Sequence, residues 1–355
     1  MTDKTLKYVI PKLNKTSTQI STTVTNDFAV IGVDRYIETD SGYIYANVSS
    51  LGYTYDGINY IQSKSGDILN GISKVDFNGY QWIACGYNDP QTESIVISSD
   101  GINWTTPISN ALHSYILDIV WGSKKWVAIG QVILDPDSLI NRIAYSSDGM
   151  NWTLSTYNSN NHVAGFNCVA YNGSYFLAGG YNYIAKSTDG ITWTDVDVSA
   201  ILGAVSSITW NGSVWVGVGS NAYPVAHSTD GVTWTVANTI GLLNSANTVV
   251  YNGTIFLVAG TGSYKLISSK DGITWTGLIL YENESIPSAI SDMTWTGSQW
   301  ILIGNINQGD NIPKIVCSND LITWTPSTNG SILYKDTYMN SITSRNRKNY
   351  FLTYT

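Results

Sequence analysis

The chain has 355 residues, and only 12% of them are charged, about half the share usual in soluble proteins. It contains 13 Trp, 24 Tyr and 32 Gly, enough aromatic side chain to build a sizeable core, which excludes intrinsic disorder. The 18 basic against 26 acidic residues give a net charge of −8, which argues against a nucleic-acid partner. No apolar run approaches the roughly 18 residues of a membrane helix, so we expect no membrane insertion.

The chain begins with a basic segment, residues 1–17, which we expect to form an arm outside a single domain of residues 18–355. Its four lysines and one aspartate give +3, which leaves −11 on the domain. A disordered tail is one interpretation, and docking onto a neighbouring subunit or an acidic partner is the other. The segment lacks the apolar core of a secretory signal, so export by that route is not expected.

An eight-residue box of the form Ser-x-Asp-Gly-x-x-Trp-Thr then recurs along the chain. Six copies are close to this form, and a degenerate one at 53–60 carries Tyr60 in place of Trp. The successive box aspartates are 44, 48, 41, 41, 41 and 49 residues apart, which indicates a 41-residue repeat with insertions. The box residues are Asp56, Asp100, Asp148, Asp189, Asp230, Asp271 and Asp320, with Trp104, Trp152, Trp193, Trp234, Trp275 and Trp324.

A second motif precedes six of the boxes, for example at 75–86 and 208–219. It consists of alternating apolar residues, a turn such as Asn-Gly, an aromatic residue and a second alternating run, which is typical of a β-hairpin. The box supplies another hairpin, so each repeat has four strands. Four strands in about 41 residues, repeated seven times, predict an all-β protein, a β-propeller of four-stranded blades.

The two ends of the chain leave the closure of the ring open. Residues 337–355 resemble one more first hairpin without a box, and residues 26–48, with Ser41-Gly42 followed by Tyr45, resemble another. The simplest interpretation is seven blades, one of them completed by strands from both termini. Eight blades, one without a box, is the alternative.

All 13 tryptophans fall within the two repeating hairpins, where a thin blade needs aromatic side chains between itself and its neighbours. The Asp and Ser oxygens of the box can accept backbone N–H groups, while Gly tolerates a positive φ. We therefore expect a structural role for the boxes. Leu321 replaces the Gly of the last box, so that turn is expected to be altered.

The box resembles the Asp-box, or BNR repeat, of sialidase-like propellers, and the resemblance covers about residues 20–355. It implies the propeller fold, whereas functions in that superfamily range over sialidases, other glycosidases, lectins and assembly factors. A sialidase site needs three clustered arginines, a Tyr nucleophile and acidic partners. The chain has four arginines, of which Arg345 and Arg347 share one predicted turn and Arg35 and Arg142 stand alone. The catalytic arrangement does not carry over, so we predict no enzyme.

Three acids, Asp76, Asp118 and Asp292, lie close to first hairpins and are candidates to face a ligand. Asp118 and Asp292 occupy the same place before an aromatic residue, which directs them towards the central channel. Solvated strand ends are one interpretation, and a carboxylate pair for acid–base chemistry is another.

The other chemistry-bearing residues give no site. The three histidines form no triad, and no phosphate loop opens a helix. The three cysteines, Cys85, Cys168 and Cys317, are far apart and are predicted to be buried, so neither a disulfide nor a zinc site is indicated. We predict no cofactor and no resident metal, although Asp135 with Asp137, or Asp310 with Asn311, offers oxygen ligands to calcium.

The insertions between repeats are rich in Asn, Asp, Ser and Tyr, which suits hydrogen bonding to sugars or to proteins. They are residues 63–73, 87–94, 132–141, 155–162, 281–289 and 306–313. The favoured function is a non-enzymatic structural or adhesive propeller on a virion surface, anchored to neighbouring virion or assembly proteins by residues 1–17. A glycan-binding lectin, cytoplasmic or exported without a signal, and a divergent glycoside hydrolase are the alternatives.

Overall fold

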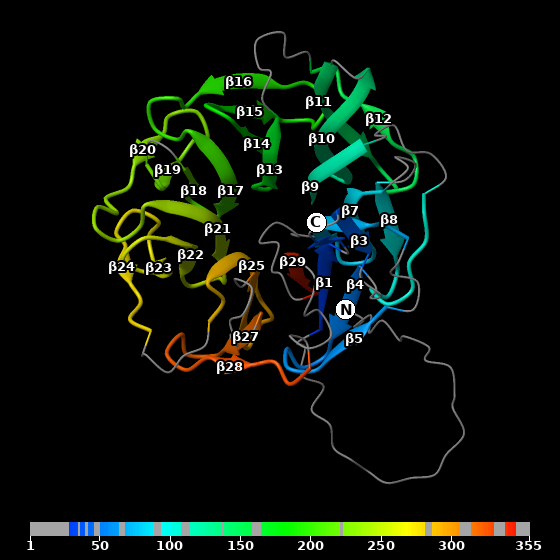
Figure 1. The fold of residues 1–355 in the computed structure, drawn as a ribbon. Coiled ribbons are helices and arrows are strands. Elements are labelled where there is room, and N and C mark those ends of the chain that lie inside the picture. Colours follow the sequence, from blue (N-terminus) through cyan, green and yellow to red (C-terminus); the bar gives the residue numbers. More distant parts are fainter. Residues whose placement is uncertain are drawn as a thin grey trace, which may run out of the picture.

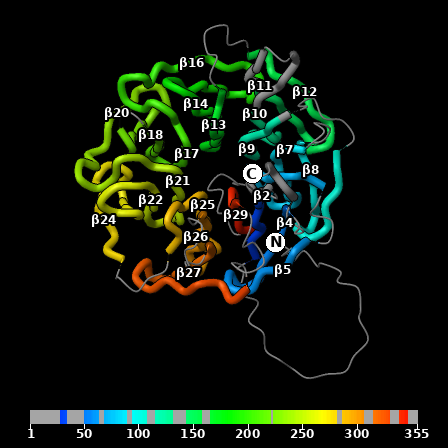
Figure 2. The backbone as a smooth tube through the Cα atoms, in the orientation of Figure 1, coloured from blue at the N-terminus to red at the C-terminus, as the bar shows by residue number. Residues whose placement is uncertain are grey.

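A computed structural model gives the fold. It describes residues 28–34, 36–39, 42–45, 50–63, 68–88, 94–107, 114–135, 138–157, 165–220, 223–280, 286–305, 314–329 and 338–345. These residues contain 29 β-strands and no helix, so the described part of the chain has no helix that could cross a membrane. The strands form a ring of blades around a central channel, as Figures 1 and 2 show. Residues 1–17 and the candidate calcium ligands Asp137, Asp310 and Asn311 lie outside the described residues.

The ring has seven blades, which confirms the simpler of the two blade counts. In each blade the first strand lines the channel and the others follow outwards. From blade 1 to blade 7, the first strands are β29 (Tyr338–Ser344), β6 (Gly71–Phe77), β9 (Ser114–Gly122), β13 (Phe166–Tyr171), β17 (Ala204–Trp210), β21 (Ser245–Tyr251) and β25 (Ala289–Trp295). The second strands are β1 (Ala29–Asp34), β7 (Trp82–Tyr87), β10 (Lys125–Asp135), β14 (Phe176–Gly180), β18 (Trp215–Ser220), β22 (Phe256–Thr261) and β26 (Trp300–Asn305).

The third and fourth strands lie outside these two. The third strands are β4 (Leu51–Thr54), β8 (Ile95–Ser98), β11 (Ser138–Ser146), β15 (Tyr183–Ser187), β19 (Val225–Ser228), β23 (Leu266–Ser269) and β27 (Ile315–Ser318). The fourth strands are β5 (Tyr60–Gln62), β12 (Thr153–Leu154), β16 (Thr194–Asp197), β20 (Thr235–Val236), β24 (Thr276–Gly277) and β28 (Thr325–Pro326). In blade 2 a single β-bridge between Ile97 and Thr105 takes the place of the fourth strand.

Blade 1 closes the ring with strands from both ends of the chain, as predicted, but in a different way. The C-terminal β29 is its innermost strand and pairs antiparallel with the N-terminal β1 (Figure 2). The hairpin predicted around Ser41-Gly42 is not a blade hairpin, because β2 (Tyr36–Thr39) and β3 (Gly42–Tyr45) pair only with each other within the described strands. Residues 26–48 and 337–355 thus contribute one strand each to a shared pair.

The antiparallel order gives the ring two different faces. First and third strands end, and second and fourth strands begin, at the edge that carries the hairpin turns and the boxes, which we call the box face. Connections from second to third strands, and from each blade to the next, leave from the opposite edge, the connection face. Every insertion predicted from the sequence falls in one of these connections.

The core lies between the blades. The described apolar residues form seven clusters, one at each contact between neighbouring blades. At the contact of blades 2 and 3, for example, Ile83 and Cys85 of blade 2 meet Trp126 and Trp152 of blade 3. A buried Trp removes roughly 200 Å² from water, about 5 kcal/mol before entropy is counted, so these aromatics supply much of the cohesion of the ring. All three cysteines are buried, as expected.

The boxes share one hydrogen-bond network. The Ser or Thr hydroxyl accepts the N–H of the residue after Asp, and Asp Oδ1 accepts the next two N–H groups at 2.7–2.9 Å. The altered turn expected at Leu321 is not found, because Leu321 adopts φ 63° and keeps the whole network. The hydrogen bonds therefore hold even a leucine in the left-handed conformation, at a cost of roughly 1–2 kcal/mol.

Candidate functional site

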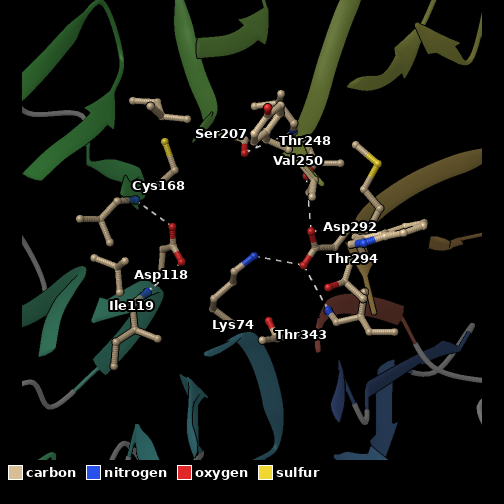
Figure 3. A pocket seen from close by; sticks show the side chains of 18 of the residues that line it. Lys74, Asp118, Ile119, Cys168, Ser207, Thr248, Val250, Asp292, Thr294 and Thr343 are labelled. Carbon is tan, nitrogen blue, oxygen red and sulfur yellow. Dashed lines mark hydrogen bonds and ion pairs between the residues drawn. The ribbon is translucent and has the colours of Figure 1, made fainter. Parts of the chain in front are cut away.

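One residue of each first strand occupies the same position beside the central channel, three residues before the aromatic residue at the hairpin turn or, in β29, before Ser344. A β-bulge precedes this channel position in every blade. Such bulges re-aim side chains next to the bulged residue. The seven residues are Lys74, Asp118, Cys168, Ser207, Thr248, Asp292 and Ser341. All of them except Ser341 line a pocket in the channel, together with Val250, Thr294 and Thr343 (Figure 3).

Asp118 is buried at this position and links blade 3 to blade 4. Its Oδ1 accepts the N–H of Ile119, and its Oδ2 accepts the N–H of Val169 in the neighbouring blade, both at 2.8 Å. The interpretation as a solvated strand end is therefore wrong for Asp118. The carboxylate lines the pocket, but it also satisfies two backbone donors.

Asp292 makes the corresponding contacts between blade 7 and blade 1. Its Oδ1 accepts the N–H of Met293 at 2.9 Å, and its Oδ2 accepts the N–H of Ile342 in the C-terminal strand at 3.1 Å. It is also buried, so it is not a solvated strand end either. Lys74 Nζ lies 3.1 Å from Asp292 Oδ2, which places an ion pair across the channel between blades 7 and 2 (Figure 3).

Asp76 lies elsewhere. It is buried, but it is not among the residues that line the pocket, and its Oδ2 accepts the N–H of Trp121 in the next blade at 3.4 Å. The structure brings Asp118 and Asp292 to one channel and leaves Asp76 in the seam between blades 2 and 3.

The distribution of side chains at the channel position follows a backbone requirement. First strands of adjacent blades do not pair as a ladder, and in four blades an N–H of the first strand is accepted by the channel side chain of the blade before it. Ser341 and Ser207 each accept one such N–H, from Val75 and Val249. Lys74 of blade 2 cannot accept a hydrogen bond from blade 3. The N–H of Ile119 in blade 3 is accepted instead by the carboxylate of Asp118, the residue before it. A carboxylate satisfies two donors where one hydroxyl satisfies one.

Lys74 is the channel residue that sequence reasoning missed. Alignment of the first strands on their terminal aromatic residues places Lys74 in the same position as Asp118 and Asp292, so the signal was present. Cys168 also faces the pocket; burial raises the pKa of its thiol, and the charge of Asp118 raises it further. The described residues contain no group of three or more His, Cys, Asp or Glu that could hold a metal ion.

The connection face presents exposed aromatic side chains. Tyr115, Tyr181 and Tyr338 are exposed there, and Tyr115 lies with its ring 5.2 Å from that of Tyr87 across blades 2 and 3. Most of the residues of the insertions themselves lie outside the described ones.

No known protein family and no curated protein matches the sequence. Among solved structures, the computationally designed Ika8 protein is similar with a TM-score of 0.54 and 9% identity, over 89% of this chain and 90% of that chain. A chain of the nidogen/laminin complex is similar with a TM-score of 0.46 and 13% identity, over 68% of this chain and 89% of that chain. The likeness to the designed protein shows the fold alone. The protein is a seven-bladed β-propeller.

Proposed function

We propose that this chain is a non-catalytic binding propeller, a structural or adhesive component of a particle such as a virion, and that its partner contacts the connection face. The observation that carries the proposal is that the repeated features and the variable insertions lie on opposite faces of the ring. The box face repeats one hydrogen-bond network in every blade, whereas all six insertions fall in connections of the opposite face. Function in repeat folds lies in the loops that vary between repeats.

The channel supports a non-catalytic role. Asp118 and Asp292 each accept backbone N–H groups from two residues, and Asp292 also pairs with Lys74. A hydrolase that uses two carboxylates needs one of them free to give or take a proton at the substrate. These contacts favour architectural use of both carboxylates instead.

Residues 1–17 are the proposed anchor to the particle, because they carry +3 next to a domain of −11. We also assign the repeat to the Asp-box type of the sialidase-like superfamily, on the strength of the seven equivalent box networks. The test of the anchor is a chain that begins at residue 18. It is expected to fold normally and to lose its place on the particle, and normal incorporation would contradict the anchor.

The test of the main proposal is recovery of the intact chain from purified particles by mass spectrometry. The chain is expected at stoichiometric amounts, and a soluble chain absent from particles would overturn the placement. Hydrolysis of aryl glycosides that Asp118→Asn or Asp292→Asn abolishes would overturn the non-catalytic role.

A glycan is a second candidate partner, favoured by the pair of Tyr87 and Tyr115 on the connection face. Paired aromatic faces beside Asn- and Ser-rich connections suit stacking and hydrogen bonding of a sugar ring. On a glycan array, Tyr115→Ala is expected to lose binding. Tyr80→Ala, an equally drastic change at an exposed tyrosine of the box face, is expected to retain it. Absence of any glycan signal would leave the protein-binding role as the function.

A further inference from the structure

The channel pocket already holds one ammonium group of the chain itself. Lys74 Nζ lies 3.1 Å from Asp292 Oδ2, the same oxygen that accepts the N–H of Ile342 (Figure 3). A carboxylate oxygen has more than one acceptor site, so a backbone N–H does not exclude an ammonium from it. Asp292 thus fixes a neighbouring strand and binds a cation at the same time.

Asp118 repeats the geometry of Asp292 in another blade. Each carboxylate accepts the N–H of the following residue with Oδ1 and an N–H of the next blade with Oδ2. Around the ring, Lys74 belongs to the second blade after that of Asp292, and the second blade after that of Asp118 carries Ser207 at the channel position. A serine side chain is shorter than a lysine by about the length of an aminoethyl group. Ser207 therefore does not extend to the place beside Asp118 that corresponds to that of the Lys74 ammonium beside Asp292.

The pocket includes this place. Asp118, Cys168, Ser207 and Thr248 line it together (Figure 3). Its volume is about 60 Å³, room for about four water molecules at roughly 15 Å³ each. Among the described residues that line it, the two carboxylates of Asp118 and Asp292 stand against the one ammonium of Lys74, which leaves a charge of −1. Since charges interact strongly away from water, this surplus of negative charge favours a small cation that donates hydrogen bonds.

The pocket extends to the box face. Tyr251, Asn252 and Trp295 line it where the first strands end, and all three are half-buried. Aromatic rings attract cations. Asp118 lies three residues before Trp121 at the hairpin turn, about 10 Å along the strand from this edge, which is deeper than a lysine side chain of a partner reaches. The pocket therefore suits a free small amine.

We propose that the channel pocket binds one small primary alkylammonium ion between Asp118 and Ser207. The ammonium donates hydrogen bonds to the Asp118 carboxylate and to the Ser207 hydroxyl, and the short alkyl chain lies among apolar lining residues such as Val250. The proposal goes beyond the proposed function, because it assigns a ligand to the channel and not to the connection face. Both carboxylates keep their contacts with the backbone when the ligand is bound.

The first test is calorimetric titration of the full-length chain with ethylammonium. Saturable binding of one ion per chain is expected, and ethanol, a neutral probe of similar size, should not bind. Asp118→Asn should weaken binding at least about tenfold, because it removes a charge-assisted hydrogen bond. The matched control is Asp76→Asn, a buried carboxylate of another first strand that does not line the pocket, and it should leave the affinity within about threefold.

The second test exchanges the two side chains on which the proposal depends. Lys74→Ser gives blade 2 the channel residue of blade 5 and opens the corresponding place beside Asp292, so two ions per chain should bind. Ser207→Lys supplies a second ammonium from the chain itself and should abolish binding. Circular dichroism must show that each variant is folded.

The outcomes that overturn the proposal are distinct from those that bear on the proposed function. Absence of saturable binding, equal binding of ethanol, unchanged affinity in Asp118→Asn, or one ion per chain in Lys74→Ser would overturn it. A capped lysine that binds as tightly as ethylammonium would assign the pocket to a lysine of a partner and overturn the free amine. Partner binding on the connection face is measured separately and does not depend on these results.

Discussion

Blades 1 and 5 have the same four-stranded plan but different sources of cohesion. Blade 5 is formed by one continuous stretch of chain, and its first hairpin pairs Trp210 with Trp215. In blade 1 the corresponding pair is Ser344 with Ala29, and Tyr60 stands where the other boxes have Trp. The blade that joins the two ends of the chain thus lacks the aromatic pair of the first hairpin that the other six keep, and a buried Tyr takes the place of the box Trp.

Polar contacts tie the first strand of blade 1 to both neighbouring blades, as the side chains of Asn167 and Asn247 do in blades 4 and 6. In β29, Asn340 donates to the carbonyl of Ile72 at 3.0 Å, and Thr343 donates to the carbonyl of Val75 at 2.5 Å. On the other side, Asp292 accepts the N–H of Ile342. Apolar packing is non-directional, whereas these bonds require one register. Because no short connection joins β29 to β1, hydrogen bonds of this kind are needed to fix its register.

The largest expected effect is that of Trp234→Ala in blade 5. This side chain lies in the cluster between blades 4 and 5, so its removal leaves a large cavity and should cost about 3–5 kcal/mol of unfolding free energy. Denaturant unfolding measures the loss. Retention of any partner binding by the folded variant is also expected, because the box face is not the proposed binding face. A loss below about 1 kcal/mol would show that the box aromatics are not the main source of cohesion.

The next largest effect is expected where blade 7 meets the C-terminal strand of blade 1. Asp292→Asn should cost about 2–3 kcal/mol, because it removes an acceptor for Ile342 and the partner of Lys74. Hydrogen exchange should rise first in β29. Asp118→Asn is the matched control at the same position of blade 3, and it should raise exchange around Val169 while leaving β29 protected. An equal rise of hydrogen exchange in β29 in both variants would contradict the conclusion that Asp292 holds this strand specifically.

Acid should act on all blades alike. The backbone N–H groups of Thr233 and Val232 lower the pKa of Asp230 to about 2, and those of Thr274 and Ile273 lower that of Asp271 to about 2. A pKa below the unfolded value of about 4 means that the stabilisation is complete above pH 4 and is lost as the pH falls towards 2. Unfolding free energy measured between pH 5 and pH 2 should therefore decline. Asp230→Asn should cost about 1 kcal/mol at pH 7 and reduce that decline.

The sequence was sufficient for the repeating part of the fold and for a closure by both termini, but not for the pairing of the strands that make this closure. Boxes and Asn-Gly hairpins are local signals, and six near-copies of each predict the blades. The pairing of β1 with β29 joins residues about 310 positions apart, and no local pattern encodes it. The Gly and Tyr around residue 42 imitate a blade hairpin locally, so that prediction failed. In the channel, the shared position of Asp118 and Asp292 was visible, but Lys74 became significant only when its contact with Asp292 across blade 1 was known.

The smallest expected effect concerns the box of blade 7, where two terms oppose each other. Leu321→Gly removes the strain of a left-handed leucine, worth about 1 kcal/mol, but also its packing against the apolar cluster between blades 6 and 7, so the net change should stay within about 1 kcal/mol. Leu321→Ala keeps the strain and loses most of the packing, so it should be less stable than Leu321→Gly although alanine is the larger residue. In blade 5, Gly231→Ala should be destabilising, since a Cβ there meets the ring of Tyr175 at 2.9 Å and φ is 71°. Thermal unfolding of the three variants orders them, and an alanine more stable than glycine at 321 would show that packing, not backbone conformation, decides this turn.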